Sequence, residues 1–559
     1  MYIRQISQKR KDGSRTRYLQ LAEKYRDPET GRPKDKILYH FGREDEIDKG
    51  QLRRLAKSLT RFLDPSDRLE FEAEQAGVSA HNLVLEKCLA IGGCHVLDTL
   101  WKRIGIHETL RKLLQDRAFE VDVERHIFSM VANRALDPRS KLAVERWVGR
   151  KVAIDGLEEV AVHNLYRAMD FLIENRAEIE RSVFFAVATL LNLEVDLLFF
   201  DTTSTYFELE DEDEGEDDLR RYGHSKDKRP DRPQIVIGLA VTRDGIPVRC
   251  WVLPGNTADA SVVEGIQKDM AGWRLNRVVW VLDRGMTGEK QRIALQRGGG
   301  HVIFGEKIRG TTKANAEALA RPGRFQVVRD NLEVKEVFVE EGSERRRFVV
   351  VRNPKEAERD KRRREETIAR LEQEIEQLNR RRRNGCSHSK AVCELKTHRV
   401  KGRYVRELKT GELRIDRAKV TEEEKYDGKY LLSSTDSSLT VEDIALGYRQ
   451  LWQVERAFRT LKTTLELRPL YHRREERVRA HVLLSWLALL LVRVTEQKAG
   501  ASWDVFRDDL QDISRATLRN DDGVVHLRSE LTSTQKATLS ALGVQPPPAI
   551  IRIAPTHVV

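Results

Sequence analysis

Two unbroken apolar runs, each followed directly by an aspartate, constrain the fold more than any other feature of the sequence. Residues 197–200 lead into Asp201, and residues 278–282 lead into Asp283. A short apolar run between polar residues is typical of a strand that is buried on both faces, as in the middle of an α/β sheet. An acid at the end of such a strand is expected at the rim of the sheet, where ligands bind. The sequence therefore predicts an α/β core with two acids at one edge.

A third acid, Glu455, lies in a segment, 447–470, whose pattern predicts one amphipathic helix. Tyr448, Glu455 and Lys462 are seven residues apart, so one helix would present all three on one side. An apolar stripe runs beside them and would fasten the helix to a core: Leu451, Val454, Phe458, Leu461 and Leu465. The same pattern is typical of a helix with solvated charges. The two aspartates upstream favour a functional role for Glu455.

These acidic stretches resemble the three motifs of DDE transposases from insertion sequences, specifically the insertion-sequence-four type. The resemblance spans residues 197–481, roughly half of the chain. The motifs and the connecting stretches that carry it are 198–204, 222–231, 281–286, 427–430 and 448–462.

The last motif departs from the family pattern at one position. Three residues stand at the pattern's spacing: Tyr448, Glu455 and Lys462. Leu451 stands where the family has an arginine, and Arg449 or Arg459 could supply the missing charge.

The order of expected elements agrees with the ribonuclease-H-like α/β core that the resemblance implies. Three strands of antiparallel type precede a strand, a helix and a further strand. In order they are expected from 197, then at 234–242, 247–252, 278–282, from the stretch 283–288 on to about 296, and at 301–304. Residues 208–218, between the first two strands, are rich in acids but lack the ligand spacing of a calcium loop, so we predict a solvated insertion there.

Changes in composition predict seven segments along the chain. They are a small antiparallel β domain (1–43), a helical linker (44–79), a helical and possibly DNA-binding domain (80–192), the first part of the core (193–306), a β-rich insertion with a long basic helix (307–439), the second part of the core (440–499) and a C-terminal tail (500–559).

Periodicity and turn residues predict the elements outside the core. In the first segment, strands are expected at 2–7, 16–25 and 36–41; in the third, helices are expected at 81–90, 96–103, 106–114, 123–134 and 162–192. Thr440 is the expected N-cap of the first core helix after the insertion.

Two basic clusters are candidates for contact with nucleic acid. In the helical domain the cluster comprises Arg139, Lys141, Arg146, Arg150 and Lys151. In the insertion, residues 361–364 and 380–383 flank a predicted helix at 354–384. Both clusters are also typical of solvated helices, but for the insertion helix we favour contact with nucleic acid.

The three acids together predict a metal site. Cleavage of a phosphodiester needs a nucleophilic oxygen, a stabilised leaving oxygen and neutralised phosphate charge, which two divalent ions about 3.5–4 Å apart supply. Hard oxygen ligands suit Mg²⁺ or Mn²⁺. We predict that Asp201 bridges two ions while Asp283 and Glu455 each complete one site. Each acid also has a structural interpretation: a strand cap, a turn former and an ion-pair partner.

The resemblance implies further residues that contact DNA. Tyr448 and Lys462 would contact the phosphate near the cut, and Arg459 could take the place of the absent arginine. His224 and Lys226, in the connecting stretch, could contact DNA or shape their loop.

The predicted function is DNA transposition by a homodimer on double-stranded DNA. Water would free a 3′-hydroxyl at the element end, and that hydroxyl would attack target DNA. Two alternatives remain: a nuclease of the same fold that does not join strands, and a non-catalytic DNA-binding protein derived from a transposase. A Ser/His hydrolase of the nucleophile-elbow type is excluded because no GxSxG sequence is present.

Composition agrees with a polyanionic partner inside a reducing cytoplasm. The 559 residues carry a formal charge of +11, with 34% charged residues. Lysine and arginine that neutralise phosphates release condensed counterions. The five cysteines form no CxxC pair, which argues against a disulfide framework or a structural zinc site. The longest apolar run, 482–492, is too short to span a bilayer, so we predict a buried helix.

Overall fold

The computed structural model divides the chain into two compact units. One comprises residues 1–88, 515–529 and 548–559, and the other comprises 89–514 and 530–547. The structure describes residues 1–556 apart from 10–14, 60–61, 192–196, 216–217, 272, 274–277, 287, 289–291, 294–299, 310–311, 342–343 and 385–388.

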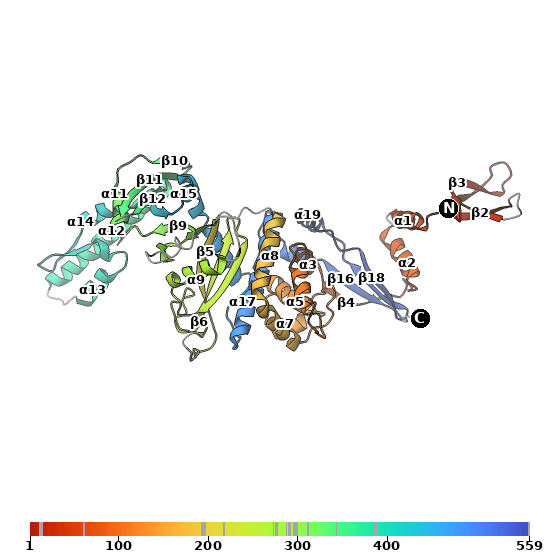
Figure 1. The fold of residues 1–559 in the computed structure, drawn as a ribbon, viewed down its shortest axis with the longest axis horizontal. Helices are drawn as coiled ribbons and strands as arrows, with labels where there is room; N and C mark the ends of the chain where they lie inside the picture. Colours follow the sequence, from red (N-terminus) through yellow and green to blue (C-terminus); the bar gives the residue numbers. More distant parts are fainter. Residues whose placement is uncertain are drawn as a thin grey trace. The chain divides into compact units, whose positions relative to one another are not determined.

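The described residues of the first unit form two sheets and two helices (Figure 1). Its N-terminal sheet confirms the three predicted strands: β1 (Tyr2–Lys9), β2 (Arg15–Arg26) and β3 (Pro33–Arg43). Helices α1 (Lys49–Leu59) and α2 (Pro65–Gln75) follow. The second sheet has the order β18-β17-β16-β4, from β4 (Val84–Ala90), β16 (Ser514–Arg519), β17 (Gly523–Arg528) and β18 (Ile550–Pro555).

Two predictions are wrong in this part of the chain. The helix expected over 81–90 is strand β4, and the expected tail contains three strands and two helices. Strand β4 is paired within a sheet whose other three strands come from the C-terminal segment. Because this pairing supplies hydrogen bonds from distant residues, it overrides the local helical pattern.

The helical domain of the second unit is built around two buried helices. Every residue of α5 (Val123–Leu136) is buried. Helix α17 (Glu475–Ala499) is long and apolar enough to cross a membrane by length and composition alone, but 94% of its most apolar window is buried inside the protein. It packs against α5 and α7, as Figure 1 shows, and is a core helix. The other helices are α3 (Gly92–Arg103), α4 (Ile106–Leu114), α6 (Lys141–Trp147), α7 (Val162–Glu174), α8 (Arg176–Leu191), α18 (Trp503–Gln511) and α19 (Ser533–Ala541).

The single helix predicted over 162–192 is two helices, α7 and α8. Asn175 ends α7, and its side-chain amide donates to the Phe171 carbonyl at 2.9 Å. An asparagine that bonds the backbone in this way competes with continuation of the helix.

The core sheet has the strand order β7-β6-β5-β8-β9, from β5 (Leu197–Tyr206), β6 (Gln234–Thr242), β7 (Pro247–Pro254), β8 (Val279–Leu282) and β9 (His301–Glu306). The first three strands in sequence pair antiparallel, whereas β8 pairs parallel to both β5 and β9. This is the predicted ribonuclease-H-like core. Helix α9 (Asp259–Ala271) lies between β7 and β8 in the chain. Most of the helix expected from the stretch 283–288 to about 296 falls outside the described residues, but Arg292 and Ile293 within it are helical. Before it, Arg284–Met286 form one 3-10 turn.

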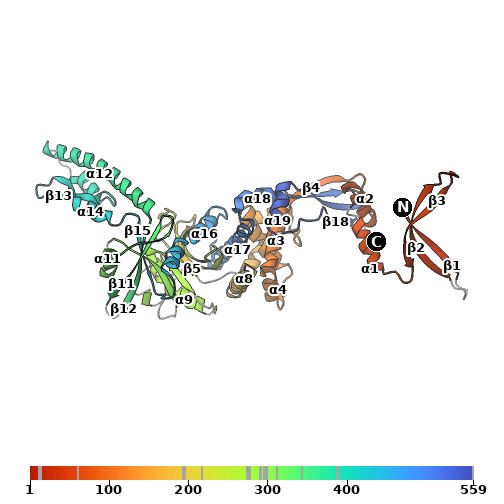
Figure 2. The same ribbon diagram turned by 90° about the horizontal axis from the view of Figure 1, so that it is seen from above.

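The insertion extends the core sheet rather than forming a separate β domain. Strands β10 (Gln326–Arg329), β11 (Leu332–Glu341), β12 (Glu344–Arg352) and β15 (Lys429–Ser434) continue it beyond β9 to nine strands. Helix α11 (Lys313–Ala320) packs on this extension. A second lobe has its own apolar core and comprises α12 (Pro354–Arg383), α13 (Ser389–Thr397), β13 (Val405–Glu407), β14 (Leu413–Ile415) and α14 (Arg417–Glu424), with α12 prominent in Figure 2.

Candidate active site

The alternation of side chains along β5 assigns Asp201 to one face of the sheet. Leu198 and Phe200 join the apolar core formed with α9. On the opposite face lies α15 (Val441–Arg449), because a Cβ atom on its Gly447 would meet Leu197 Cδ1 at 3.0 Å. Side chains two residues apart in a strand share a face, so the Asp201 side chain lies on the same face as Leu197, the face that α15 covers.

The parallel register places Asp201 and Asp283 level on neighbouring strands. Phe200 of β5 is paired with Leu282 of β8, and each aspartate is the next residue. The prediction that Asp201 ends its strand is wrong, because β5 continues to Tyr206. Strand β8 does end before Asp283, so Asp201 lies beside the position at which its neighbouring strand stops.

Tyr448 connects α15 to the second aspartate. Its hydroxyl donates a hydrogen bond to Asp283 Oδ1 at 2.9 Å. Burial raises the pKa of the Tyr448 hydroxyl, and the negative charge of Asp283 raises it further, so the hydroxyl keeps its proton at neutral pH. Tyr448 and Asp283 both line a cavity of about 310 Å³ with Glu455. Its complete lining is Asp283, Leu332, Asn353, Tyr430, Tyr448, Arg449, Leu451, Trp452 and Glu455.

The single helix predicted over 447–470 is broken. Helix α15 ends at Arg449, and α16 (Trp452–Lys462) begins three residues later. The break follows the packing of the two helices, since α15 contacts β9, β11 and β12 whereas α16 contacts β5 and β6. Tyr448 and Glu455 therefore come from different helices, although both face the same cavity. The predicted Thr440 N-cap is confirmed, with the Asp443 amide donating to Thr440 Oγ1 at 3.0 Å.

Asp201 lies among other charged groups. Burial raises its pKa to about 6; Lys226 opposes this shift, while the negative charges of Asp283 and Asp259 add to it. The Lys226 ammonium lies 3.9 Å from Asp201 Oδ1 and 3.2 Å from Asp259 Oδ2. It also donates to the Thr202 carbonyl at 2.8 Å. Lys226, predicted to contact DNA, is thus bonded to groups of its own chain.

Asp259 is a site residue that the sequence analysis missed. It opens α9, and its carboxylate accepts a hydrogen bond from the Thr202 hydroxyl. A Cβ atom on Gly285 would lie 3.9 Å from Asp259 Oδ2, so this carboxylate approaches the turn after Asp283. No apolar run leads directly into Asp259, so the pattern that revealed the other two aspartates does not apply to it.

Lys462 is also held by its own chain. Its ammonium donates to Asp227 Oδ1 at 2.6 Å, and Arg468 bonds the same oxygen. Burial lowers the pKa of Lys462, whereas Asp227 raises it. Because Asp227 belongs to the stretch 222–231, this contact fastens that stretch to α16.

The other predicted DNA contacts differ in position. Among the described residues His224 and Arg459 are exposed, and neither side chain has a hydrogen-bonding partner there. Leu451, at the arginine position of the family pattern, is buried and lines the cavity. Arg449 lines the cavity too, unlike Arg459, so Arg449 is better placed to supply the missing charge.

Comparison with known proteins identifies the family. Residues 196–491 match the model of the transposase DDE domain, and residues 3–70 match that of the N-terminal domain of IS1634 family transposases. The first match covers more than half of the 559 residues. The chain belongs to the DDE transposases. It is a DNA transposase, an enzyme that cleaves DNA and transfers strands, and its partner is DNA.

Further comparisons add little detail. No curated protein sequence matches this transposase. Among solved structures, the piggyBac transposase in a synaptic complex with hairpin DNA is similar, with 11% identity and a TM-score of 0.33, over 75% of this chain and 78% of that chain. The N-terminal match is to the IS1634 family, so the predicted insertion-sequence-four subtype is not confirmed.

The acids of the transposase have the chemistry that a divalent ion requires. Asp201, Asp283 and Asp259 bring carboxylate oxygens near the end of β8, and the charges of the other two contribute to the raised pKa of Asp201. A cation relieves such repulsion, as the Lys226 ammonium does for Asp201 and Asp259. Within the described part of the chain, no group of three or more His, Cys, Asp or Glu side chains is close enough to hold a metal ion.

Gly305 allows Tyr448 to reach Asp283. A Cβ atom at this position of β9 would lie 2.2 Å from the Tyr448 hydroxyl oxygen. We expect Gly305→Ala to displace the Tyr448 ring and lower the rate of DNA cleavage roughly ten- to a hundredfold, since a hydrogen bond to a charged group contributes about 1.5–3 kcal/mol. The cleavage rate of a labelled duplex measures this loss.

A double-mutant comparison tests the cause of that loss. Tyr448→Phe should reduce cleavage as much as Gly305→Ala does, and the double variant should lose little more. Gly265→Ala is the matched control because nothing lies within 4 Å of its Cβ position. Fully additive losses in the double variant would show that Gly305 acts independently of Tyr448.

Proposed function

We propose that Asp201, Asp283 and Glu455 are the catalytic acids of this transposase and hold its divalent ions, Mg²⁺ or Mn²⁺. The observation that carries the proposal is the parallel register, which puts Asp201 beside Asp283. Glu455 lines a cavity with Asp283 and Tyr448, which supports its inclusion. In this assignment the three carboxylates would hold the ions, with Asp201 serving both of them and Asp283 and Glu455 one each.

Bound divalent ions would neutralise phosphate charge and activate the attacking oxygen. The protein's own groups prepare the acids for this task. The Tyr448 hydroxyl orients Asp283 through its hydrogen bond. The Lys226 ammonium offsets part of the repulsion around Asp201, whose pKa is nevertheless raised to about 6, chiefly by burial.

The remaining predicted residues divide by exposure. We assign contact with DNA to His224 and Arg459, whose side chains are exposed. For Tyr448, Lys226 and Lys462 the contacts with Asp283, Asp259 and Asp227 support a role in positioning the site, with DNA contact beyond it. Tyr448 carries its proton and so can also donate to a phosphate oxygen after a small rotation.

The finer course of the reaction is part of the same proposal. Water frees a 3′-hydroxyl at the element end, and that hydroxyl then attacks target DNA. Two ends must be held together for this, so we propose a homodimer on DNA, acting in the cytoplasm. The motif spacing over 448–462 supports an insertion-sequence-four type of catalytic segment, joined to an N-terminal domain of the IS1634 type.

Cleavage and joining of a labelled duplex that carries the element ends test the proposal. We expect Asp283→Ala and Glu455→Ala each to reduce both steps at least about a thousandfold, the kinetic equivalent of losing several kcal/mol of transition-state stabilisation. Glu340→Ala, which removes an exposed carboxylate from β11, is the control and should retain activity.

The products separate the alternatives. A wild-type protein that nicks the duplex without joining it to target DNA would be a nuclease of the same fold. If both acid variants cleave as fast as the wild type, the acids are structural, and the assignment of the active site fails.

A further inference from the structure

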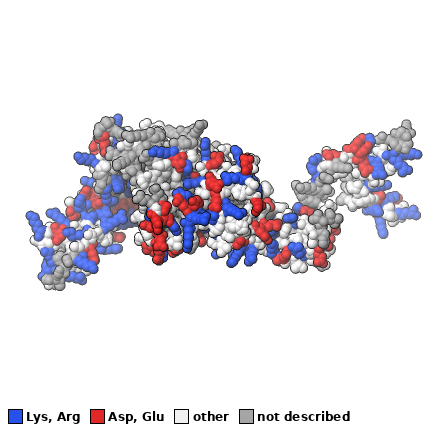
Figure 3. Space-filling model, turned by 60° about the horizontal axis from the view of Figure 1, so that its bottom comes forward, with Lys and Arg blue, Asp and Glu red and all other residues white. Residues whose placement is uncertain are grey.

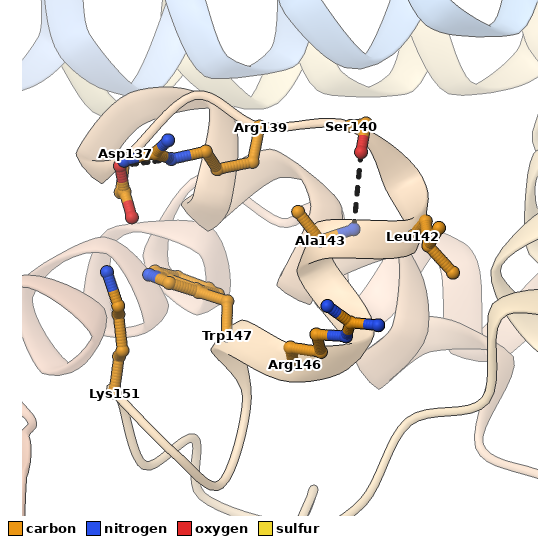
Figure 4. A pocket seen from close by; sticks show the side chains of 8 residues that line it. All are labelled: Asp137, Arg139, Ser140, Leu142, Ala143, Arg146, Trp147 and Lys151. Carbon is orange, nitrogen blue, oxygen red and sulfur yellow. Dashed lines mark hydrogen bonds and ion pairs between the residues drawn. The ribbon is translucent and has the colours of Figure 1, made fainter.

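The helical domain contains a basic cavity that is separate from the active site. It has a volume of about 400 Å³ and lies around α6 (Figure 4). Its lining is Asp137, Arg139, Ser140, Leu142, Ala143, Arg146, Trp147 and Lys151. Three of these side chains are cationic and one is acidic.

Most of the positive charge at this cavity is not neutralised. Arg139 Nε bonds Asp137 Oδ1 at 2.9 Å, which accounts for the one acid. Within the described part of the chain, the exposed side chains of Arg146, Arg150 and Lys151 form no ion pair or hydrogen bond. The nearest acid in the sequence, Glu145, is engaged elsewhere, since it accepts the Val162 amide at 3.0 Å.

The basic helix α12 contains both paired and unpaired arginines. Four exposed arginines have acidic partners: Arg359 with Glu356, Arg362 with Glu358, Arg380 with Glu376 and Arg383 with Glu412. Within the described part of the chain, the exposed side chains of Arg363, Arg370 and Arg381 form no ion pair or hydrogen bond. Basic and acidic side chains are likewise interspersed over the face drawn in Figure 3. An arginine that is already paired releases fewer counterions on binding a phosphate, so the paired arginines of α12 are the matched comparison for the unpaired cations near the cavity.

The cavity is rigidly built and tied to the catalytic helices. Trp147 is 3% exposed and forms part of its wall. Ser140 caps α6, with the Ala143 amide donating to its hydroxyl at 3.3 Å. The buried Arg134 guanidinium donates a hydrogen bond to the carbonyl of Arg139, which lines the cavity, at 3.1 Å, and another to the Leu465 carbonyl at 3.3 Å. Leu465 follows α16, so the cavity and the catalytic helix share one support.

We propose that this cavity forms a docking site for the backbone phosphates of double-stranded DNA of any sequence, with the unpaired cations Arg146 and Lys151 in its lining and Arg150 next to them in the chain. The enzyme acts on DNA, and unpaired cations on a fixed frame are what a phosphate backbone requires. The exposed Leu142 at the rim offers an apolar surface to a deoxyribose. Contacts of this kind position DNA without reading its sequence.

The test is a salt titration of DNA binding. Fluorescence anisotropy of the full-length protein is measured in EDTA with an element-end duplex and with a scrambled duplex. The variant is Arg146→Gln, Arg150→Gln, Lys151→Gln, and the control removes the same charge from α12: Arg359→Gln, Arg362→Gln, Arg380→Gln. Because catalysis is absent in EDTA, the outcome is independent of the three-acid proposal.

We expect the slope of log K against log[salt] to fall by about two to three for the variant, since each phosphate contact contributes about 0.9. Affinity should fall similarly for both duplexes, while the control keeps close to the wild-type slope. Arg146→Lys with Arg150→Lys should also keep that slope. The proposal is overturned if a correctly folded variant keeps the wild-type slope, if the control loses as much, or if the loss is confined to the element-end duplex.

Discussion

Replacing Asp201 with asparagine is expected to abolish DNA cleavage and to make the folded protein more stable at pH 8. Burial and the nearby charges of Asp283 and Asp259 raise the pKa of Asp201 to about 6, although Lys226 opposes the shift. The charged carboxylate is therefore unfavourable in the folded state. An uncharged amide removes that cost. It also removes the negative charge and one of the two oxygens with which a carboxylate binds a metal ion.

The pH dependence of this gain follows from the sign of the shift. The folded pKa lies above the ordinary value of 3.8, so charging Asp201 destabilises the folded state as the pH rises from about 4 to about 6. Above pH 6 the cost is complete, at most about 3 kcal/mol at 1.36 kcal/mol per pKa unit. Asp201→Asn should thus exceed the wild type by about 1–3 kcal/mol at pH 8, and the difference should vanish near pH 4.

Urea unfolding of metal-free protein at several pH values measures the difference. Asp227→Asn is the matched control: Asp227 is 3% exposed and ion-paired to Lys462 and Arg468, so its replacement should destabilise the protein. If Asp201→Asn is the less stable protein at pH 8, the charged carboxylate stabilises the folded state, and the inferred cost of its charge is wrong. If Asp201→Asn still cleaves DNA as fast as the wild type, the catalytic assignment is wrong.

The parts of the fold that were predicted correctly are the buried strands, because each one appears in the sequence as an apolar run. The apolar runs at 197–200 and 278–282 can be covered only inside a sheet, and they become β5 and β8. Their order with β6 and β7 was sufficient for the ribonuclease-H-like topology. The level positions of Asp201 and Asp283 follow from two such runs lying parallel.

What the sequence did not reveal depends on long-range packing. Gln450 and Leu451 are ordinary helix formers, and the break between α15 and α16 arises because the two helices cover different strands. Strand β4 needs partners from the C-terminal segment. Asp259 reaches the site only through the fold of α9 onto β5.

Some of the ion pairs in the basic clusters could have been predicted from the sequence. Along α12, Glu356, Glu358 and Glu376 stand three or four residues before an arginine, the spacing that forms ion pairs on a helix. No acid stands three or four residues before Arg146, Arg150 or Lys151, and Glu145 accepts the Val162 amide. The contact of α12 with nucleic acid stays a prediction.

The second large effect is expected at Glu124, in the buried centre of the helical domain. Its side chain is 0% exposed and lies against Arg125, whose side chain is 5% exposed. Its carboxylate accepts hydrogen bonds from Trp101 Nε1 at 2.6 Å and from Arg125 Nε at 2.7 Å. Burial raises the pKa of Glu124, but the Arg125 contact outweighs it and the pKa is lowered.

Glu124→Ala should lower the free energy of unfolding by about 3–5 kcal/mol, because it leaves the Arg125 charge and the Trp101 donor buried without this partner. Glu124→Gln should cost less, since an amide oxygen still accepts from Trp101. A depressed pKa means that this contribution is present above the ordinary value of 4.5 and is lost as the pH falls. Thermal unfolding at pH 7 and at pH 4 measures it.

The double variant Glu124→Met with Arg125→Met decides whether the ion pair itself stabilises the domain. Both charges are then removed together and replaced by apolar side chains of similar length. We expect most of the loss in Glu124→Ala to be recovered, because the cost of that variant is an uncompensated charge rather than a missing attraction. Asp98 accepts a hydrogen bond from Arg125 Nη1 at 2.8 Å in the wild type. In the double variant Asp98 keeps its other cationic partner, the Lys102 ammonium, at 2.7 Å. If the double variant is as unstable as Glu124→Ala, the charges hold α3 and α5 together by direct attraction, and their replacement by packing is not tolerated.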